Sequence, residues 1–70
     1  MTQVIKQHTE NGYYVVLEWV KVDIYKVEVC PCYSNGMCGY PVREMVYPLG
    51  EKKKAVATYN RYVRKYCKGL

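Results

Sequence analysis

Residues 13–29 read YYVVLEWVKVDIYKVEV, and this stretch decides the fold. Apolar side chains occupy the odd positions of its first half, which is the period of a strand with one buried face. The apolar positions become even at Val20 and odd again at Tyr25. Because a strand changes faces only through a turn or a bulge, we predict two strands with a reversal within residues 20–23.

An Asn-Gly pair at residues 11–12 precedes this stretch. Asn-Gly is the strongest short signal for a hairpin, because both residues tolerate a positive φ. We therefore predict a first strand around residues 4–5 that pairs with the strand beginning at Tyr13.

A second Asn-Gly pair, at residues 35–36, follows it. This pair predicts another hairpin, between a strand that ends near Tyr33 and one at residues 37–46. Pro31 and Pro41 fall inside these two strands, and proline donates no hydrogen bond to a sheet. The hairpin should therefore lie at a sheet edge or carry a bulge.

From residue 51 onward the apolar spacing becomes helical, with a stripe at Ala55, Tyr59, Tyr62 and Tyr66. Gly69 is a suitable helix stop. The residues that broaden the stripe are Val56, Val63 and Cys67. The helix should cover one face of the sheet.

The sequence thus predicts an α+β fold, in which a small antiparallel β-meander of about three to five strands precedes one C-terminal amphipathic helix packed on one sheet face. Seventy residues suit one small domain, 1–70, with a β-sheet region at 1–50 and a basic helix at 51–68.

Positive charge is concentrated in the last twenty residues. These residues contain seven lysines and arginines and a single acid, Glu51, for a net charge of +6. The first fifty residues have a net charge of −1, and the whole chain has +5. No acid stands three or four places from Arg61, Arg64 or Lys65 to form helix-stabilising pairs. We therefore predict that this face binds another macromolecule. The predicted binding residues are Lys52, Lys53, Lys54, Arg61, Arg64, Lys65 and Lys68.

Four cysteines raise the question of a metal site. Cys30, Cys32 and Cys38 are spaced C-x-C-x5-C, unlike the paired C-x2-C motifs of zinc ribbons and knuckles. A two-residue Asn-Gly turn would pair Tyr33 with Cys38 and put Cys38 on the opposite face from the other two thiols. On that pairing we expect neither a zinc site nor a Cys32–Cys38 disulfide, and no cofactor. The alternative is a small zinc-stabilised structural domain that uses these three cysteines.

Catalytic groups are sparse. His8 is the only histidine and Ser34 the only serine, and the sequence places no base beside a nucleophile. The acids stand singly along the strands, without the paired carboxylates that acid–base hydrolysis requires. We expect no enzymatic activity and no catalytic residue.

Nine tyrosines and no phenylalanine supply most of the aromatic surface. The helix rings follow the i, i+3, i+7 spacing of a buried stripe, so we assign them to the core rather than to base stacking. A single helix does not cover a whole meander, which predicts an exposed aromatic sheet surface suited to a protein partner or to self-association. Its predicted members are Tyr13, Trp19, Tyr25 and Tyr33.

Two classes of partner fit these features. A basic helix beside an exposed tyrosine-rich sheet is typical of a protein-binding module, and we prefer a protein partner. The alternative is a nucleic-acid-binding domain, in which the same helix contacts phosphates and the sheet stacks on bases.

In length and layout the chain resembles small proteins of bacteriophages and mobile elements, some of which inhibit host enzymes such as CRISPR nucleases. The resemblance covers size and architecture. It implies an inhibitor or accessory protein directed at a host nucleic-acid enzyme. Many such inhibitors imitate nucleic acid with acidic surfaces, which a chain of net charge +5 does not do.

The N-terminal residues lack the apolar stretch of a secretory signal, and no run approaches the about 20 apolar residues of a membrane span. We therefore expect a cytoplasmic protein that does not enter a membrane. A 70-residue chain builds only a small core, and exposed aromatic surface suits self-association, so a monomer and a homodimer are equally expected.

Overall fold

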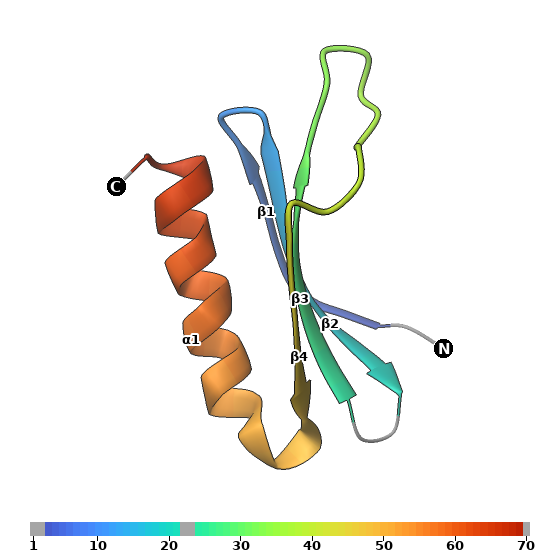
Figure 1. Ribbon diagram of the computed structural model, residues 1–70, viewed down its shortest axis with the longest axis vertical. Helices are drawn as coiled ribbons and strands as arrows, with labels where there is room; N and C mark the ends of the chain where they lie inside the picture. Colours follow the sequence, from blue (N-terminus) through green and yellow to red (C-terminus); the bar gives the residue numbers. More distant parts are fainter. Residues whose placement is uncertain (1–2, 22–23, 70) are drawn as a thin grey trace.

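The chain forms a four-stranded antiparallel sheet with one helix packed against one of its faces (Figure 1). The computed structural model describes residues 3–21 and 24–69. Neighbouring strands follow the order of the sequence, β1-β2-β3-β4, so the sheet is a meander and the predicted α+β class is confirmed. The elements are β1 (Gln3–Glu10), β2 (Tyr13–Lys21), β3 (Ile24–Pro31), β4 (Arg43–Pro48), the 3-10 turn η1 (Leu49–Glu51), α1 (Lys52–Tyr62) and the π-helical turn η2 (Val63–Cys67).

The first hairpin turns at its Asn-Gly pair, as predicted. Asn11 and Gly12 have φ values of 56° and 79°, both in the left-handed region. A tight hairpin turn needs a positive φ at both central residues, which Asn and Gly adopt at the least cost. The turn brings Glu10 of β1 opposite Tyr13 of β2.

The phase change in the sequence corresponds to a bulge near the end of β2. The register between β2 and β3 shifts between Trp19 and Lys21, so Val20 is an extra residue on β2. An extra residue reverses the side on which the following side chains lie. The reversal predicted within residues 20–23 falls between these two strands, and residues 22–23 themselves lie outside the described part of the chain.

The second predicted hairpin is wrong in its length. β3 ends at Pro31 and β4 begins only at Arg43, so residues 32–42 form a loop where strands were expected to continue. The chain does turn tightly at Asn35-Gly36, where the Gly36 N–H donates to the Tyr33 carbonyl over 2.9 Å and Gly36 has a φ of 85°. Pro41 lies in this loop, where its missing N–H breaks no ladder. The expectation of an edge position is confirmed, because β4 is the last strand of the sheet.

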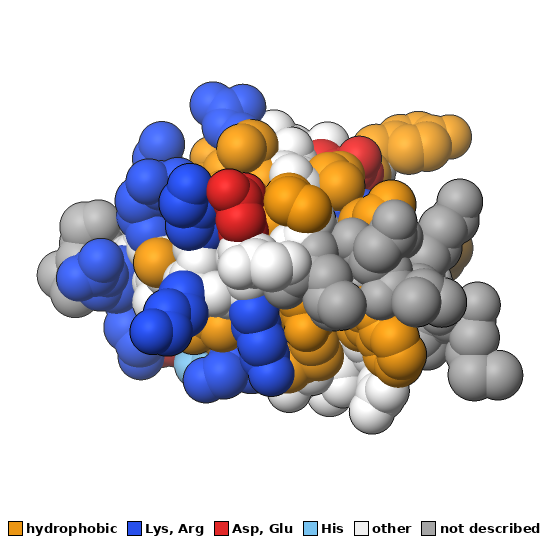
Figure 2. Space-filling model, turned by 90° about the horizontal axis from the view of Figure 1, so that it is seen from below, with side chains coloured by type: hydrophobic (Ala, Val, Ile, Leu, Met, Phe, Trp, Pro, Cys, Tyr) orange, Lys and Arg blue, Asp and Glu red, His pale blue; other side chains and the backbone are white. Residues whose placement is uncertain are grey.

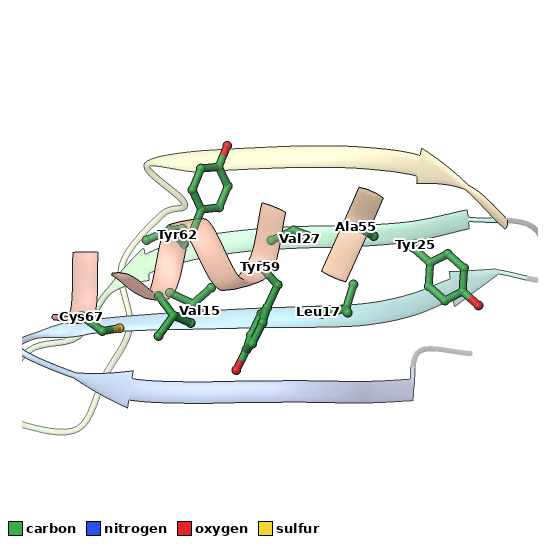
Figure 3. Packing of buried hydrophobic residues seen from close by; sticks show 10 residues of the cluster. Val15, Leu17, Tyr25, Val27, Ala55, Tyr59, Tyr62 and Cys67 are labelled. Atoms are coloured by element: carbon green, nitrogen blue, oxygen red, sulfur yellow. The ribbon is translucent and has the colours of Figure 1, made fainter. Parts of the chain in front are cut away.

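The core lies between the helix and the facing side of β2 and β3 (Figure 3). Leu17 and Val27 are fully buried on the strands, and Ala55 is fully buried on the helix. Burial of a Leu or Val side chain contributes about 1.5–3 kcal/mol, so this contact dominates the stability of the sheet–helix pair. The buried cluster consists of Val15, Leu17, Tyr25, Val27, Val29, Ala55, Tyr59, Tyr62, Val63 and Cys67.

The helix ends in a widened turn that keeps its last apolar residues on the core. The backbone N–H of Lys68 donates to the Val63 carbonyl over 3.1 Å, the i to i+5 bond of a π-helix. Cys67 is buried, and its Sγ donates to the Tyr13 carbonyl over 3.7 Å. The predicted stop is confirmed, since Gly69 adopts a φ of 70° directly after the helix.

Candidate functional site

All seven cations of the predicted binding face are exposed. α1 turns Ala55, Tyr59 and Tyr62 toward the sheet, so the opposite side of the helix is left to solvent. Figure 2 shows Lys and Arg side chains gathered on that side of the molecule. We call the surface formed by Lys52, Lys53, Lys54, Arg61, Arg64, Lys65 and Lys68 the basic face.

Carboxylates partner only two of these cations within residues 3–21 and 24–69. Lys54 Nζ lies 3.1 Å from Oε1 of Glu51, the residue that directly precedes α1. Lys68 Nζ lies 3.5 Å from Glu10 Oε1 on β1. Both pairs are exposed, and exposed pairs contribute at most about 1 kcal/mol. The charge of the basic face is therefore largely uncompensated by the described part of the protein.

Two cations are positioned over tyrosine rings. The Arg61 guanidinium lies 5.6 Å from the centre of the Tyr62 ring, and Lys65 Nζ lies 5.4 Å from that of Tyr66. Tyr62 is buried and Tyr66 half-buried, so the rings are fixed by the core. A cation above a fixed ring loses side-chain freedom before it meets a ligand. This arrangement favours a preformed binding surface.

A groove runs beside the helix, along β1. α1 packs mainly on β2, β3 and β4, and the final turn η2 packs on β2 and β1, so β1 is the strand that the helix covers least. The groove has a volume of about 610 Å³. Its described lining consists of His8, Ala57, Tyr59, Asn60, Val63, Arg64 and Lys68. The hydrogen-bond donors Asn60, Arg64 and Lys68 therefore line a groove at one side of the basic face.

The carboxylate of Glu10 offsets part of the positive charge in this groove. His8 Nε2 lies 2.7 Å from Glu10 Oε1, on the same side of β1. The hydrogen bond with His8, followed by the charge of Lys68, lowers the pKa of the Glu10 carboxyl below its ordinary value. His8, singled out in the sequence as a lone histidine, thus has a carboxylate partner two residues away. Ser34, the lone serine, lies exposed in the loop between β3 and β4.

The first turn of the helix carries the remaining cations. Lys52 and Lys53 lie beside a hollow of about 800 Å³ lined by residues 50–54 and Val56. No side chain of the described residues caps the first turn of α1. The positive end of the helix dipole disfavours lysine here by a few tenths of a kcal/mol per residue. An anionic ligand would relieve that cost.

The predicted aromatic surface is wrong for two of its four members, Tyr13 and Tyr25, whereas Trp19 and Tyr33 are exposed. Tyr25 is buried in the core, and Tyr13 packs against Tyr66 of the helix with ring centres 5.3 Å apart. The odd positions of β2 and β3 face the helix, so the rings at these positions are covered where the helix packs. Trp19 remains partly exposed, at the end of β2. The sheet therefore presents no row of rings for bases to stack on.

Two tyrosine rings, Tyr33 and Tyr40, are exposed in the loop between β3 and β4. Tyr33 is 58% and Tyr40 is 93% exposed, and Met37 between them is 65% exposed. The sequence predicted exposure of Tyr33, but exposure of Met37 and Tyr40 was missed, because residues 37–46 were expected to form a strand with one covered face. The loop gives the molecule an exposed apolar surface of its own.

The sheet face away from the helix is acidic. Glu18, Glu28 and Glu44 lie on it around Lys26, because Glu18 pairs with Lys26 and Glu28 with Glu44 across the strands. Lys26 Nζ lies 3.2 Å from Glu28 Oε1. Burial, aided by the neighbouring Glu28 and opposed by Lys26, raises the pKa of Glu18. From the sequence we expected single, solvent-facing acids. The register of β2, β3 and β4 places Glu18, Glu28 and Glu44 close together.

The cysteine pairing expected from a two-residue turn is wrong. Cys32, not Tyr33, pairs with Cys38 in an isolated antiparallel bridge. The two thiols therefore share a face, and their Sγ atoms are 3.0 Å apart. Among residues 3–21 and 24–69, no three His, Cys, Asp or Glu side chains are arranged to hold a metal ion, so Cys30 does not complete a zinc site with this pair.

No helix in the described ranges has the length and apolar character that crossing a bilayer requires. No family model matches the chain, and no match was found among the curated proteins or among the solved structures. Evidence for function therefore comes from the surfaces described above.

Proposed function

We propose that the protein is a non-enzymatic binding module that contacts an acidic surface of a protein partner through the basic face. The observation that carries this proposal is the set of five cations for which the described residues provide no carboxylate: Lys52, Lys53, Arg61, Arg64 and Lys65. They stand on a helix whose other side is anchored in the core. A rigid, uncompensated positive surface attracts and orients an acidic one.

Helix stability does not account for this arrangement. Lysine in the first turn opposes the helix dipole, and Lys52 and Lys53 occupy that turn. Arg61, Arg64 and Lys65 have no acid one turn away. A surface helix selected only for solubility would carry acids among its bases. A contact outside the molecule explains why it does not.

The exposed loop supports a protein rather than a nucleic acid as the partner. Tyr33, Met37 and Tyr40 present apolar side chains of the kinds enriched in protein interfaces. Tyr13 and Tyr25 of the sheet pack in or against the core, so they are not available to stack on bases as a nucleic-acid-binding function would require.

Nucleic acid remains a second candidate because of the groove beside β1. Arg64, Lys68 and Asn60 line it together, and these side chains donate hydrogen bonds to phosphate oxygens. The two candidates differ in the anion that the basic face binds, which is carboxylate in a protein partner and phosphate in nucleic acid.

The size and layout of the chain support a narrower form of the proposal. Small α+β proteins of bacteriophages and mobile elements include inhibitors of host nucleic-acid enzymes. A chain of net charge +5 would act on such an enzyme by covering an acidic patch rather than by imitating nucleic acid. We propose this class of partner, in the cytoplasm, for the protein.

Charge reversal at two sites tests the basic face. Arg61→Glu/Arg64→Glu changes the helix, and Lys6→Glu/Arg43→Glu is the matched control, because all four side chains are exposed and both variants change the net charge equally. Binding to polyglutamate and to duplex DNA is measured by fluorescence anisotropy across a salt series. We expect the helix variant to bind polyglutamate at least about tenfold more weakly and the control within about twofold of wild type.

The outcomes separate the candidates. Equal losses in both variants would mean that binding follows net charge and not the basic face, which defeats the proposal. Tighter binding to DNA than to polyglutamate, with a steep fall in salt, would transfer the assignment to nucleic acid. An unchanged melting temperature in the helix variant shows that the loss is one of contact and not of folding.

A further inference from the structure

The first part of the loop between β3 and β4, residues 32–38, is held together by backbone hydrogen bonds. Tyr33 N–H donates to the Met37 carbonyl over 2.9 Å, and Gly39 N–H donates to the Pro31 carbonyl over 2.8 Å. These bonds flank the bridge between Cys32 and Cys38 on both sides. The two cysteines are therefore a non-hydrogen-bonded antiparallel pair.

That kind of pair brings side chains especially close. Opposed Cα atoms in a non-hydrogen-bonded pair are about 4.5 Å apart, which lies within the range of about 4.4–6.8 Å spanned by disulfides. The Sγ atoms of Cys32 and Cys38 are 3.0 Å apart. A bond between them requires rotation of side chains and no movement of strands.

The two thiols differ in their access to solvent. Cys38 is exposed and Cys32 is half-buried. The hydrogen bond with Cys38, followed by burial, raises the pKa of Cys32 to about 11. Cys32 therefore keeps its proton at neutral pH, and Cys38 is the thiol that an incoming oxidant meets first.

We propose that Cys32 and Cys38 are a redox-active dithiol that closes to a disulfide by exchange with a low-molecular-weight disulfide such as oxidised glutathione. The Cys38 thiolate attacks one glutathione sulfur, forms a mixed disulfide and releases the first glutathione as a thiol. Cys32 then loses its proton and attacks Cys38 Sγ, releasing the second glutathione. Two electrons and two protons pass from the protein to the two glutathiones.

The other thiols are not placed to compete. Cys30 lies two residues before Cys32, so it is a diagonal neighbour of Cys38, about 7–8 Å away where a disulfide needs Cβ atoms within about 4.5 Å. Cys67 is buried under the helix, with its Sγ directed at the Tyr13 carbonyl. Closure would fasten the turn at residues 33–37, which carries the exposed Tyr33 and Met37 side chains.

Differential alkylation of the whole chain tests the pair. The folded protein is incubated with oxidised glutathione, its remaining thiols are blocked with N-ethylmaleimide in denaturant, and the product is reduced and treated with iodoacetamide. Mass spectrometry then locates both labels in the tryptic peptide of residues 27–43, which contains Cys30, Cys32 and Cys38. We expect iodoacetamide on Cys32 and Cys38, maleimide on Cys30 and Cys67, and a product that has no disulfide between chains and that excess dithiothreitol reopens.

Serine variants decide the order of attack. Cys32→Ser should accumulate a stable glutathione adduct on Cys38, because the thiol that resolves it is missing. Cys38→Ser should form little adduct, and the matched control Cys30→Ser should close as wild type does. Iodoacetamide on Cys30, a disulfide only between two chains, or no oxidation would each overturn the proposal.

Discussion

The hydroxyl oxygens of Tyr47 on β4 and Thr58 on α1 lie 2.6 Å apart, and this hydrogen bond ties the edge of the sheet to the helix. Thr58 is the only buried polar residue among those described. Its hydroxyl therefore depends on Tyr47 for a partner across the interface, and the pair fixes how the helix sits on the edge strand.

Removing one member of this pair should cost more than removing both. We expect Tyr47→Phe to lower the free energy of unfolding by about 1–2 kcal/mol, because it leaves the Thr58 hydroxyl buried without its partner. Adding Thr58→Val to the Tyr47→Phe variant should lower the free energy of unfolding little further. A double-mutant cycle measured by urea unfolding gives the coupling energy, expected at about 1 kcal/mol. Strictly additive losses would show that the hydroxyls do not stabilise one another.

The sequence predicts the helix well because the helical pattern is local. The spacing of Ala55, Tyr59 and Tyr62 places these residues on one side of any regular helix, whatever the rest of the chain does. The exposure of the basic face could be predicted from the same geometry, because helix residues outside the apolar stripe point away from the sheet. The Asn-Gly turn at residues 11–12 and the reversal within residues 20–23 could be predicted because both rest on short local patterns, whereas the bulge at Val20 itself was not predicted.

The long loop could not be predicted, because a distant contact helps to set its register. Cys32 N–H donates to the Gly12 carbonyl over 2.7 Å, a bond to the neighbouring hairpin that no local pattern reveals. With Cys32 held there, Cys38 becomes its partner and Tyr33 moves to the loop tip. The acidic sheet face was missed for a related reason, because it depends on the register of three strands.

The core predicts a strong effect at Leu17, which is fully buried on β2. Leu17→Ala should lower the free energy of unfolding by about 2–5 kcal/mol, through lost burial and the cavity left behind. A domain of 70 residues has little stability in reserve, so we expect partial or complete unfolding at 25 °C. Val46→Ala, at a position 54% exposed on β4, is the control and should change stability by no more than about 0.5 kcal/mol. Circular dichroism during thermal unfolding measures both. Equal shifts would mean that the sheet–helix contact is not the core.

Cys67 should resist modification in the folded protein. Its side chain is buried, and burial raises the pKa of the thiol, so the reactive thiolate is scarce at neutral pH. We expect iodoacetamide to label exposed Cys38 first and Cys67 only after unfolding in urea. Peptide mapping over a time course distinguishes the two sites. Rapid labelling of Cys67 without denaturant would show that η2 opens readily, contrary to the packing of this turn.

The carboxyl of Glu10 should titrate below its ordinary range. Its pKa is lowered by the hydrogen bond with His8 and then by the charge of Lys68. A lowered pKa in the folded state means that ionised Glu10 favours folding above the unfolded-state pKa, and that this contribution is lost as the pH falls through the folded value. NMR titration of the Glu10 carboxyl should show the pKa return toward normal in His8→Ala. A control, Lys26→Ala, lies on the other sheet face and should leave it unchanged. A normal Glu10 pKa in the wild type would contradict the His8 contact.

Glu18 should behave in the opposite sense. Its pKa is raised, first by burial and then by the nearby Glu28, although Lys26 opposes the shift. A raised carboxyl pKa means that the ionised form is disfavoured in the folded state, so the cost present at neutral pH disappears as the pH falls through the folded pKa. Glu18→Gln removes that charge, and we expect its melting temperature at neutral pH to exceed that of the wild type. Glu44→Gln is the control, on the same face but exposed, and should change the melting temperature less. The advantage of Glu18→Gln should vanish in acid, where the wild-type carboxyl is already neutral. A lower melting temperature for Glu18→Gln at neutral pH would mean that the attraction of Lys26 outweighs burial.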